Sequence, residues 1–345
     1  MLGVRTCNAP EAHNKLYARS LTISNMREVI LNFPKQFKEG LEAAKGVKVK
    51  GKFSKIIVCG MGGSALPSNI LLTYLPDLKP PLYIHRNYGL PSGADKKSLI
   101  IAVSYSGNTE ETISAYEEAV EKGFKTIAIS CGGKLKELAE KKNLPQVIIP
   151  STGIQPRCAT GYLFSALLKT LSNSGVIEDK SEEVLEMAEN LNPLNFEAQG
   201  KNLAKKLTDK IPIIYASNSF KSLARIWKIK FNENSKIMAF WNYFPELNHN
   251  EMAGITNLKG NFHILIIRDK DDQPRISKRM ELFADLAKEK GVEVDFIELE
   301  GKNILEKIFN NLILSDWVSY YLAQEYKVDP VSLEIIEEFK KKLKE

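Results

Sequence analysis

Residues 56–65 read Ile56-Ile57-Val58-Cys59-Gly60-Met61-Gly62-Gly63-Ser64-Ala65. Four apolar residues of the kind found in buried strands run into a glycine-rich turn, and a helical pattern follows. Such a turn lets backbone N–H groups approach an anion, because glycine has no Cβ and the helix N-terminus carries positive partial charge. The stretch therefore predicts a strand–turn–helix unit of an α/β fold, with an anion-binding turn after the strand.

Short apolar runs alternate with amphipathic helical stretches along the rest of the chain. The predicted strands are residues 55–59, 81–85, 99–104, 125–130 and 147–150 in the first half, and 211–216, 236–240, 263–268 and 294–299 in the second. Near-continuous apolar strands separated by helices are typical of parallel sheets covered on both faces. The predicted fold class is α/β, with two αβα sandwich domains that each hold a mainly parallel sheet flanked by helices.

The length of 345 residues favours two domains over one. We expect the first domain at residues 21–175 and the second at residues 195–345. A polar stretch over residues 173–183, followed by residues 190–195 with Pro193, is the expected bridge between them. Residues 1–20 are read as an N-terminal extension, because they carry charges and Pro10 where a secretion signal would have an apolar run.

Composition excludes several classes of protein. The hydrophobic content of 43% and charged content of 26% are typical of a globular protein, and no run of about 18 apolar residues could span a membrane. The net charge of +6 comes from Lys interleaved with Glu, without the basic stripe that nucleic-acid binding requires. The four cysteines form no C-x-x-C pair, which disfavours zinc. We expect a cytoplasmic protein that binds no metal, cofactor, nucleic acid or membrane.

A second glycine turn is more informative about the ligand. Residues 103–112 read Val103-Ser104-Tyr105-Ser106-Gly107-Asn108-Thr109-Glu110-Glu111-Thr112. Strand alternation places Ser104 and Ser106 on one face, and Thr109 stands where a helix N-cap belongs. Three hydroxyls at a helix N-terminus predict a cradle for a monophosphate, and no Walker lysine accompanies them. The competing explanation is that the hydroxyls only cap the helix.

The first glycine turn also matches the spacing G-x-G-x-x-A of dinucleotide-binding proteins. A nicotinamide cofactor calls for Asp or Glu at the end of the second strand, but the chain has Tyr83-Ile84-His85-Arg86 there. The cofactor hypothesis is disfavoured, although Arg86 could meet a 2′-phosphate.

The Ser-Tyr-Ser-Gly-Asn-Thr-Glu-Glu-Thr loop resembles the phosphate loop of sugar isomerase (SIS) domains. Two further stretches, Gly153-Ile154-Gln155-Pro156-Arg157 and Pro245-Glu246-Leu247-Asn248-His249-Asn250-Glu251, are similar to the bifunctional phosphoglucose/phosphomannose isomerases of archaea and some bacteria. The likeness runs from about Met26 to the C-terminus. It implies two SIS domains, a homodimer and no metal.

The resemblance also implies a set of site residues. Those that match the family's phosphate- and sugar-binding positions are Ser104, Ser106, Thr109, Gly62, Gly63 and Ser64. Those that match its catalytic positions are Glu233 as the base, His249 as the ring-opening residue contributed by the partner subunit, Arg157 and Lys340. The chain departs from the family where a C-terminal Leu-Lys pair reads Phe339-Lys340, and where Leu333 replaces a hydroxyl residue found in some members.

The resemblance implies an aldose–ketose isomerase that converts glucose 6-phosphate, and mannose 6-phosphate, to fructose 6-phosphate through a cis-enediolate. A non-catalytic SIS protein that senses a phosphosugar would keep the loop with the three hydroxyls, residues 104–109 (the hydroxyl loop), but would not need Glu233 or His249. An aminosugar-phosphate isomerase and a nicotinamide oxidoreductase are two rival hypotheses. Taken singly, Glu233 and Lys340 would be ordinary exposed charges, so the isomerase hypothesis depends on the linked set.

Overall fold

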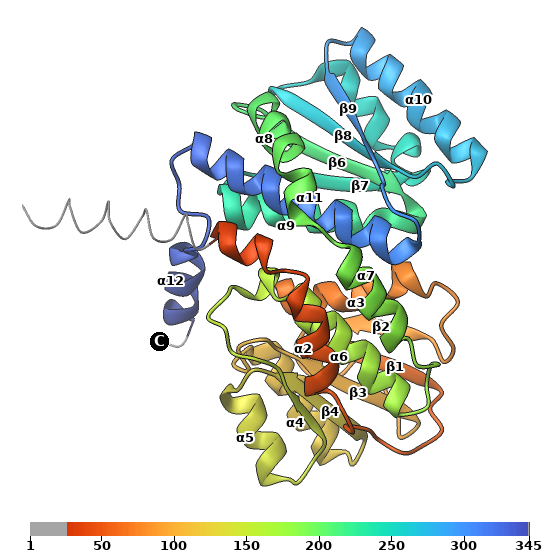
Figure 1. The fold of residues 1–345 in the computed structure, drawn as a ribbon, viewed down its shortest axis with the longest axis vertical. Helices are drawn as coiled ribbons and strands as arrows, with labels where there is room; N and C mark the ends of the chain where they lie inside the picture. The colour runs from red at the N-terminus through yellow and green to blue at the C-terminus, as the bar shows by residue number, and fades with distance from the viewer. Residues whose placement is uncertain (1–25, 344) are drawn as a thin grey trace, which may run out of the picture.

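The computed structural model describes residues 26–343 and residue 345. Two α/β units are stacked along the long axis of the molecule (Figure 1). Both sheets are parallel, with strand orders β2-β1-β3-β4-β5 and β7-β6-β8-β9. The predicted fold class is confirmed, whereas the extension predicted at residues 1–20 lies outside the described residues.

The strands of the first sheet are β1 (Lys55–Cys59), β2 (Leu82–His85), β3 (Ser98–Val103), β4 (Lys125–Ser130) and β5 (Gln146–Ile148). Alternate residues point to opposite faces. Ile57 and Ile100 pack towards α4 (Glu110–Glu121), and α5 (Gly133–Lys141) covers the rest of that face. Ile56 and Ile101 belong to the opposite face, which is covered by α2 (Lys35–Ala43), α3 (Gly62–Tyr74) and α6 (Thr160–Asn173).

The second sheet contains β6 (Ile211–Ser217), β7 (Phe240–Phe244), β8 (Phe262–Arg268) and β9 (Glu293–Glu298). The helix α10 (Pro274–Glu289) covers one face, where Phe283 packs edge-on against Tyr215 with ring centroids 5.5 Å apart. The other face is covered by α8 (Glu197–Lys206), α9 (Lys221–Lys230) and α11 (Ile304–Glu325).

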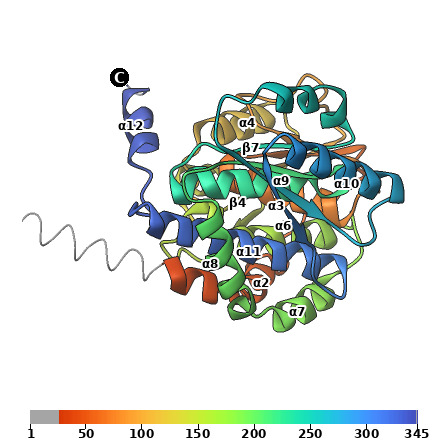
Figure 2. The same cartoon turned by 90° about the horizontal axis from the view of Figure 1, so that it is seen from above.

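The long helix α11 joins the two units. It lies between the two sheets in Figure 1, and its Phe309 packs against Phe37 of α2 at 4.6 Å and Phe164 of α6 at 5.1 Å between ring centroids. A single hydrophobic core therefore continues from the first sheet into the second. Seen from above, α11 and α9 lie over the helices of the first unit (Figure 2). We keep residues 21–175 and 195–345 as the proposed domain boundaries.

Most predicted elements are found within two residues of their predicted ends, but the strand predicted at residues 236–240 is wrong. The helix α9 continues into a π turn, η4 (Phe231–Ser235), and ends at Lys236, which has a left-handed φ of 58°. The chain needs residues 237–239 to leave this turn, so β7 begins at Phe240.

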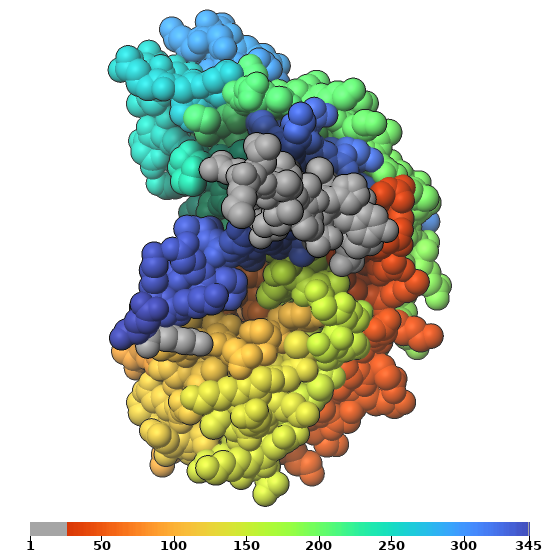
Figure 3. Space-filling model, turned by 90° about the vertical axis from the view of Figure 1, so that its left-hand side faces the viewer, coloured from red at the N-terminus to blue at the C-terminus, as the bar shows by residue number. Residues whose placement is uncertain are grey.

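Two further elements differ from the predictions. The predicted bridge over residues 173–183 and 190–195 encloses a helix, α7 (Ser181–Asn190), and ends in a 3₁₀ turn, η2 (Pro193–Phe196). The last helix, which the apolar spacing of Leu333, Ile336, Phe339 and Leu343 predicts to start near Val331, is α12 (Glu334–Lys342) and buries none of its side chains. Figure 3 views the molecule from the side on which α12 projects, and Figures 1 and 2 show that this helix stands away from the body of the molecule. No helix among the described residues is long and apolar enough to cross a membrane.

Candidate active site

The hydroxyl loop follows β3, between that strand and α4. Ser104 is completely buried, and its Oγ lies 2.9 Å from Oγ1 of Thr109 and accepts a hydrogen bond from the Gly107 N–H at 3.1 Å. Ser106 is exposed and accepts from the Asn108 N–H at 3.2 Å. Thr109 is the N-cap residue as predicted, but its hydroxyl caps none of the helix N–H groups. The first turn of α4 therefore keeps donors that an anion can use.

Gly107 gives this loop its shape. Its φ is +72°, and an added Cβ would lie 1.7 Å from the carbonyl oxygen of Gly132. The start of α5 also donates two hydrogen bonds to this loop. The Leu135 N–H donates to the Gly107 carbonyl at 2.9 Å, and the Lys134 N–H donates to Oδ1 of Asn108 at 3.0 Å. Only glycine fits between these two turns.

The glycine turn after β1 connects the hydroxyl loop to a buried arginine. Ser64 is buried, and its Oγ accepts a hydrogen bond from the Tyr105 N–H at 2.9 Å. On the other side, a Cβ added to Gly63 would lie 2.5 Å from the backbone nitrogen of Arg157. Gly62 is exposed and has a φ of +45°. The turns after β1 and β3 thus meet where the strand order reverses, the usual place for a ligand in an open α/β sheet.

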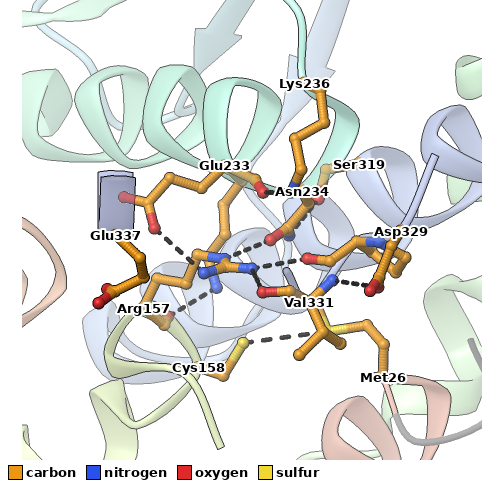
Figure 4. A network of polar contacts seen from close by, with 12 residues as sticks. Met26, Arg157, Cys158, Glu233, Asn234, Lys236, Ser319, Asp329, Val331 and Glu337 are labelled. Carbon is orange, nitrogen blue, oxygen red and sulfur yellow. Dashed lines mark hydrogen bonds and ion pairs between the residues drawn. The ribbon is translucent and has the colours of Figure 1, made fainter. Parts of the chain in front are cut away.

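Arg157 lies in a 3₁₀ turn, η1 (Pro156–Cys158), and is completely buried. Its Nη1 donates to Oε2 of Glu233 at 3.1 Å, and its Nε donates to Oδ1 of Asn234. Its Nη2 donates to the backbone oxygens of Pro330, at 2.6 Å, and Val331, at 3.3 Å (Figure 4). Contacts from two parts of the chain, residues 233–234 and 330–331, therefore fix the plane of the guanidinium.

Glu233 is carried by the π turn η4 at the end of α9. Asn234 ties the turn to α11, because its Nδ2 donates to Oγ of Ser319 at 2.9 Å. The side chain of Glu233 keeps 22% of its surface exposed, while its partner Arg157 has none. Single π turns are frequent at functional sites. Here the turn holds one partly exposed carboxylate against a buried cation.

Lys236 is a charged neighbour that the sequence did not single out. Its Nζ donates to the backbone oxygen of Glu233. Desolvation and the positive charge of Arg157 lower the pKa of Lys236 to about 8, although Asp329 and the glutamates nearby act in the opposite direction. The only sequence signal for this residue is its position three residues after Glu233.

The structure does not bring His249 and Lys340 to this cluster. His249 is exposed in η5 (Glu246–His249), the turn that follows β7, and neither residue bonds to Arg157 or Glu233 within the described chain. Lys340 is 58% exposed and donates to Glu337, one turn earlier on α12, at 2.8 Å.

The conformation of the His249 loop is nevertheless well defined. Oε1 of Glu251 accepts from the hydroxyl of Tyr215 at 2.7 Å, and its Oε2 accepts from Nδ2 of Asn242. Tyr215 lies on β6 and Asn242 on β7, so Glu251 fastens the loop to two strands of the second sheet. Glu251, at the end of the Pro245–Glu251 motif, therefore has a structural role. It holds in place the loop from which the exposed His249 side chain projects.

The described residues contain no group of three His, Cys, Asp or Glu side chains arranged to hold a metal ion. The chemistry available at the cluster is that of a partly exposed carboxylate beside a buried guanidinium. The glycine turn after β1 connects this pair to a loop rich in neutral hydrogen-bond donors. This arrangement suits proton transfer on an anionic substrate.

Comparison with known proteins agrees with this chemistry. A family model described as the C-terminal SIS domain of bacterial phospho-glucose isomerase matches residues 196–343. Among solved structures, the C-terminal domain of glucosamine-fructose-6-phosphate aminotransferase from Francisella tularensis superposes with a TM-score of 0.68 at 14% identity. The match covers 89% of this chain and 98% of that one. Fold and family model together place the chain in the class of SIS-domain phosphosugar proteins.

Curated relatives narrow this class. A bifunctional phosphoglucose/phosphomannose isomerase from Caldicellulosiruptor bescii is 41% identical over 93% of this chain and 99% of its own length. The one from Aquifex aeolicus is 35% identical over 85% of this chain and 91% of its own. A D-glucosamine-6-phosphate 4-epimerase from Sulfolobus acidocaldarius is 32% identical over 88% of this chain and 95% of its own. The chain belongs to the family of bifunctional phosphoglucose/phosphomannose isomerases, as its motifs predicted.

Proposed function

We propose that this chain interconverts glucose 6-phosphate, and mannose 6-phosphate, with fructose 6-phosphate without a metal ion. The observation that carries the proposal is the Glu233 carboxylate held at 3.1 Å by the buried Arg157, whose backbone adjoins the glycine turn. The glycine turn after β1 also contacts the hydroxyl loop, through Ser64. A sugar whose phosphoryl group is bound by Ser104, Ser106 and Thr109 would extend along Gly62-Gly63-Ser64 towards Glu233.

The chemistry requires one base and one fixed positive charge. Glu233 removes the proton from C2 of the open-chain aldose, the C2–H electron pair forms the C1–C2 double bond, and O1 takes the negative charge. The proton then adds to C1, while the proton on O2 passes to O1 and leaves the ketone at C2. Arg157 offsets the charge on the enediolate, a contribution typically worth about 3 to 4 kcal/mol.

The mannose reaction needs no additional base. The enediolate is planar at C2, so rotation of the sugar about C2–C3 lets the same carboxylate exchange the proton on either face. Replacement of a family hydroxyl by Leu333 is then expected to alter the ratio of the two rates rather than the chemistry.

Ring opening is assigned to His249 of the partner subunit in a homodimer. The imidazole is exposed at the carboxyl end of an edge strand, on a loop fastened by Glu251, and it is not bonded to Glu233 of its own chain. A second subunit is therefore the source from which a donor could reach the ring oxygen. Lys340 is proposed as the fourth member of the set, on the resemblance alone.

The test is to incubate the purified chain with fructose 6-phosphate in EDTA, without any cofactor, and to follow the sugars by NMR. We expect glucose 6-phosphate and mannose 6-phosphate to appear. Glucosamine 6-phosphate is the control substrate, because one relative is named as its epimerase. No product from fructose 6-phosphate, or product only after addition of metal or nicotinamide, would overturn the proposal.

A further inference from the structure

A lysine–aspartate pair is buried directly behind the Arg157 turn, and the proposed chemistry uses neither side chain. Lys230 is the last residue of α9, and Asp316 lies on α11. Their side chains are 1% and 8% exposed, and Nζ of Lys230 lies 2.5 Å from Oδ1 of Asp316.

The ammonium of Lys230 makes a second contact that joins the two units of the fold. Its Nζ donates to the backbone oxygen of Arg157 at 2.8 Å. The same oxygen accepts from the Thr160 hydroxyl at 3.2 Å, so both of its lone pairs are used. Lys230 also stands three residues before Glu233, at the junction of α9 and the π turn. One side chain thus contacts the main chain of the arginine and belongs to the helix end that carries the glutamate.

Stability alone does not account for such a pair. Desolvating two charges costs several kcal/mol each, and well-packed apolar residues of similar volume often serve equally well or better. Burial raises the pKa of Asp316, and the nearby charges of Lys230 and Arg157 lower it. A buried ion pair that is costly and takes no part in the chemistry is expected where it holds neighbouring groups in fixed positions.

We infer that Lys230, with Asp316 as its counter-ion, is a positioning residue that sets the distance between the Arg157 guanidinium and the Glu233 carboxylate. The inference rests on the proposed function. Lys230 acts only through Arg157 and the π turn, so its loss should lower the rate of proton transfer while phosphosugar binding at the hydroxyl loop persists. A displacement of about 1 Å at such a site can cost about 100-fold in rate.

The test replaces both members of the pair, Lys230→Met with Asp316→Leu, so that no buried charge is left alone. We expect a melting temperature near that of the unchanged protein, a fall in kcat of at least about 10-fold and a change in KM below about threefold. The matched control is Lys307→Met with Asp269→Leu, a pair whose side chains are 9% and 3% exposed and which makes no contact with Arg157. This control should leave kcat unchanged.

A structural loss is separated from a positioning effect by repeating the replacement in an Arg157→Lys background. If Lys230 acts through Arg157, the replacement costs less than about threefold in that background, because coupled residues are not additive. If the double variant does not fold, Lys230→Gln with Asp316→Asn takes its place. That neutral pair can bond within itself, but the glutamine is one atom too short to keep the contact with Arg157, so kcat should also fall.

The inference is overturned if kcat stays within about threefold of that of the unchanged protein, or if the loss is equal in both backgrounds. Failure of the proposed function is recognised separately, because the unchanged protein would then be inactive in the same assay.

Discussion

Arg157 is bonded to residues that are 76, 77 and 173 positions away in the sequence. Its five N–H donors allow it to meet a carboxylate, a side-chain amide and two carbonyls in one plane, which no lysine could do. The cost of burying its charge is offset only while these partners stay in place. Residues that shape this environment, such as Asn234, therefore affect the site without touching the substrate.

Lys236 gives this cluster a dependence on pH. Its pKa in the folded protein is about 8, below the ordinary value of 10.5. The ammonium beside Glu233 is therefore lost as the pH rises through 8, and we expect kcat/KM for fructose 6-phosphate to fall between about pH 7 and 9. The Lys236→Met variant should lack this decline, as measured by NMR at constant ionic strength. An unchanged alkaline limb in the variant would contradict this role.

The free energy of unfolding changes with pH in the opposite direction, because the titration of Lys236 is expected to raise it as the pH increases. Between about pH 8 and 10.5 the unfolded chain binds a proton at Lys236 that the folded protein has released. The penalty for burying the ammonium is thus fully present below pH 8 and is relieved as the pH rises through this range. Because the side chain is exposed, solvent screening keeps the effect small.

At the scale of elements, four turns carry the groups at the centre of the site: those after β1 and β3, the 3₁₀ turn η1 and the π turn after α9. The sequence was sufficient for the two glycine turns, because strand, glycine and cap patterns are local. It was not sufficient for β7. A π turn and a left-handed Lys236 lengthen the exit from α9, and nothing in residues 231–240 indicates this by periodicity. The contacts of Arg157 with Asn234, and of Lys230 with Asp316, were missed because they join distant segments.

The glycine turn after β1 provides a test at this scale. In Gly63→Ala the new Cβ would lie 2.5 Å from the Arg157 nitrogen and 2.6 Å from the Pro156 carbonyl carbon, and both atoms are backbone. The turn η1 must then shift, so we expect a loss of about 1–3 kcal/mol in stability and a fall in kcat of at least about 10-fold. Urea unfolding and kinetics measure the two effects.

The control for this variant is Gly254→Ala, at a position where an added Cβ meets nothing within 4 Å and φ is not left-handed. It should leave both quantities unchanged. Wild-type kinetics in Gly63→Ala would show that the glycine turn does not govern the placement of Arg157.

At the scale of the whole molecule, the two sheets have similar topologies but different residues after their central strands. In the first sheet, β1 and β3 are followed by glycines and hydroxyl residues. In the second, the loop after β8 carries Asp269, whose carboxylate binds Nζ of Lys307 at 2.8 and 2.9 Å. An acidic loop whose cation is already paired does not suit a phosphate, so one substrate per chain is expected at the first sheet. His249 and Lys340 remain outside the cluster of a single chain.

Mixed dimers test whether His249 is shared between subunits. Glu233→Gln and His249→Ala are each expected to be inactive alone with the cyclic substrate. In a dimer that contains one of each, one site regains an intact glutamate and an intact histidine only if the histidine crosses the interface. Co-expression with two tags should then give about half of the wild-type activity per dimer. Activity no higher than that of the single variants would place both groups in the same chain.

The most direct test of the account is deuterium incorporation in D₂O. The Glu233 side chain is 22% exposed, so its carboxyl proton can exchange with solvent before it returns to the sugar. Proton transfer through an enediolate therefore predicts that a fraction of the glucose 6-phosphate formed from fructose 6-phosphate carries deuterium at C2, as detected by NMR. Glu233→Gln should form neither product nor label while it still binds the phosphosugar. Product formed at a near-normal rate by Glu233→Gln, labelled or not, would contradict Glu233 as the base.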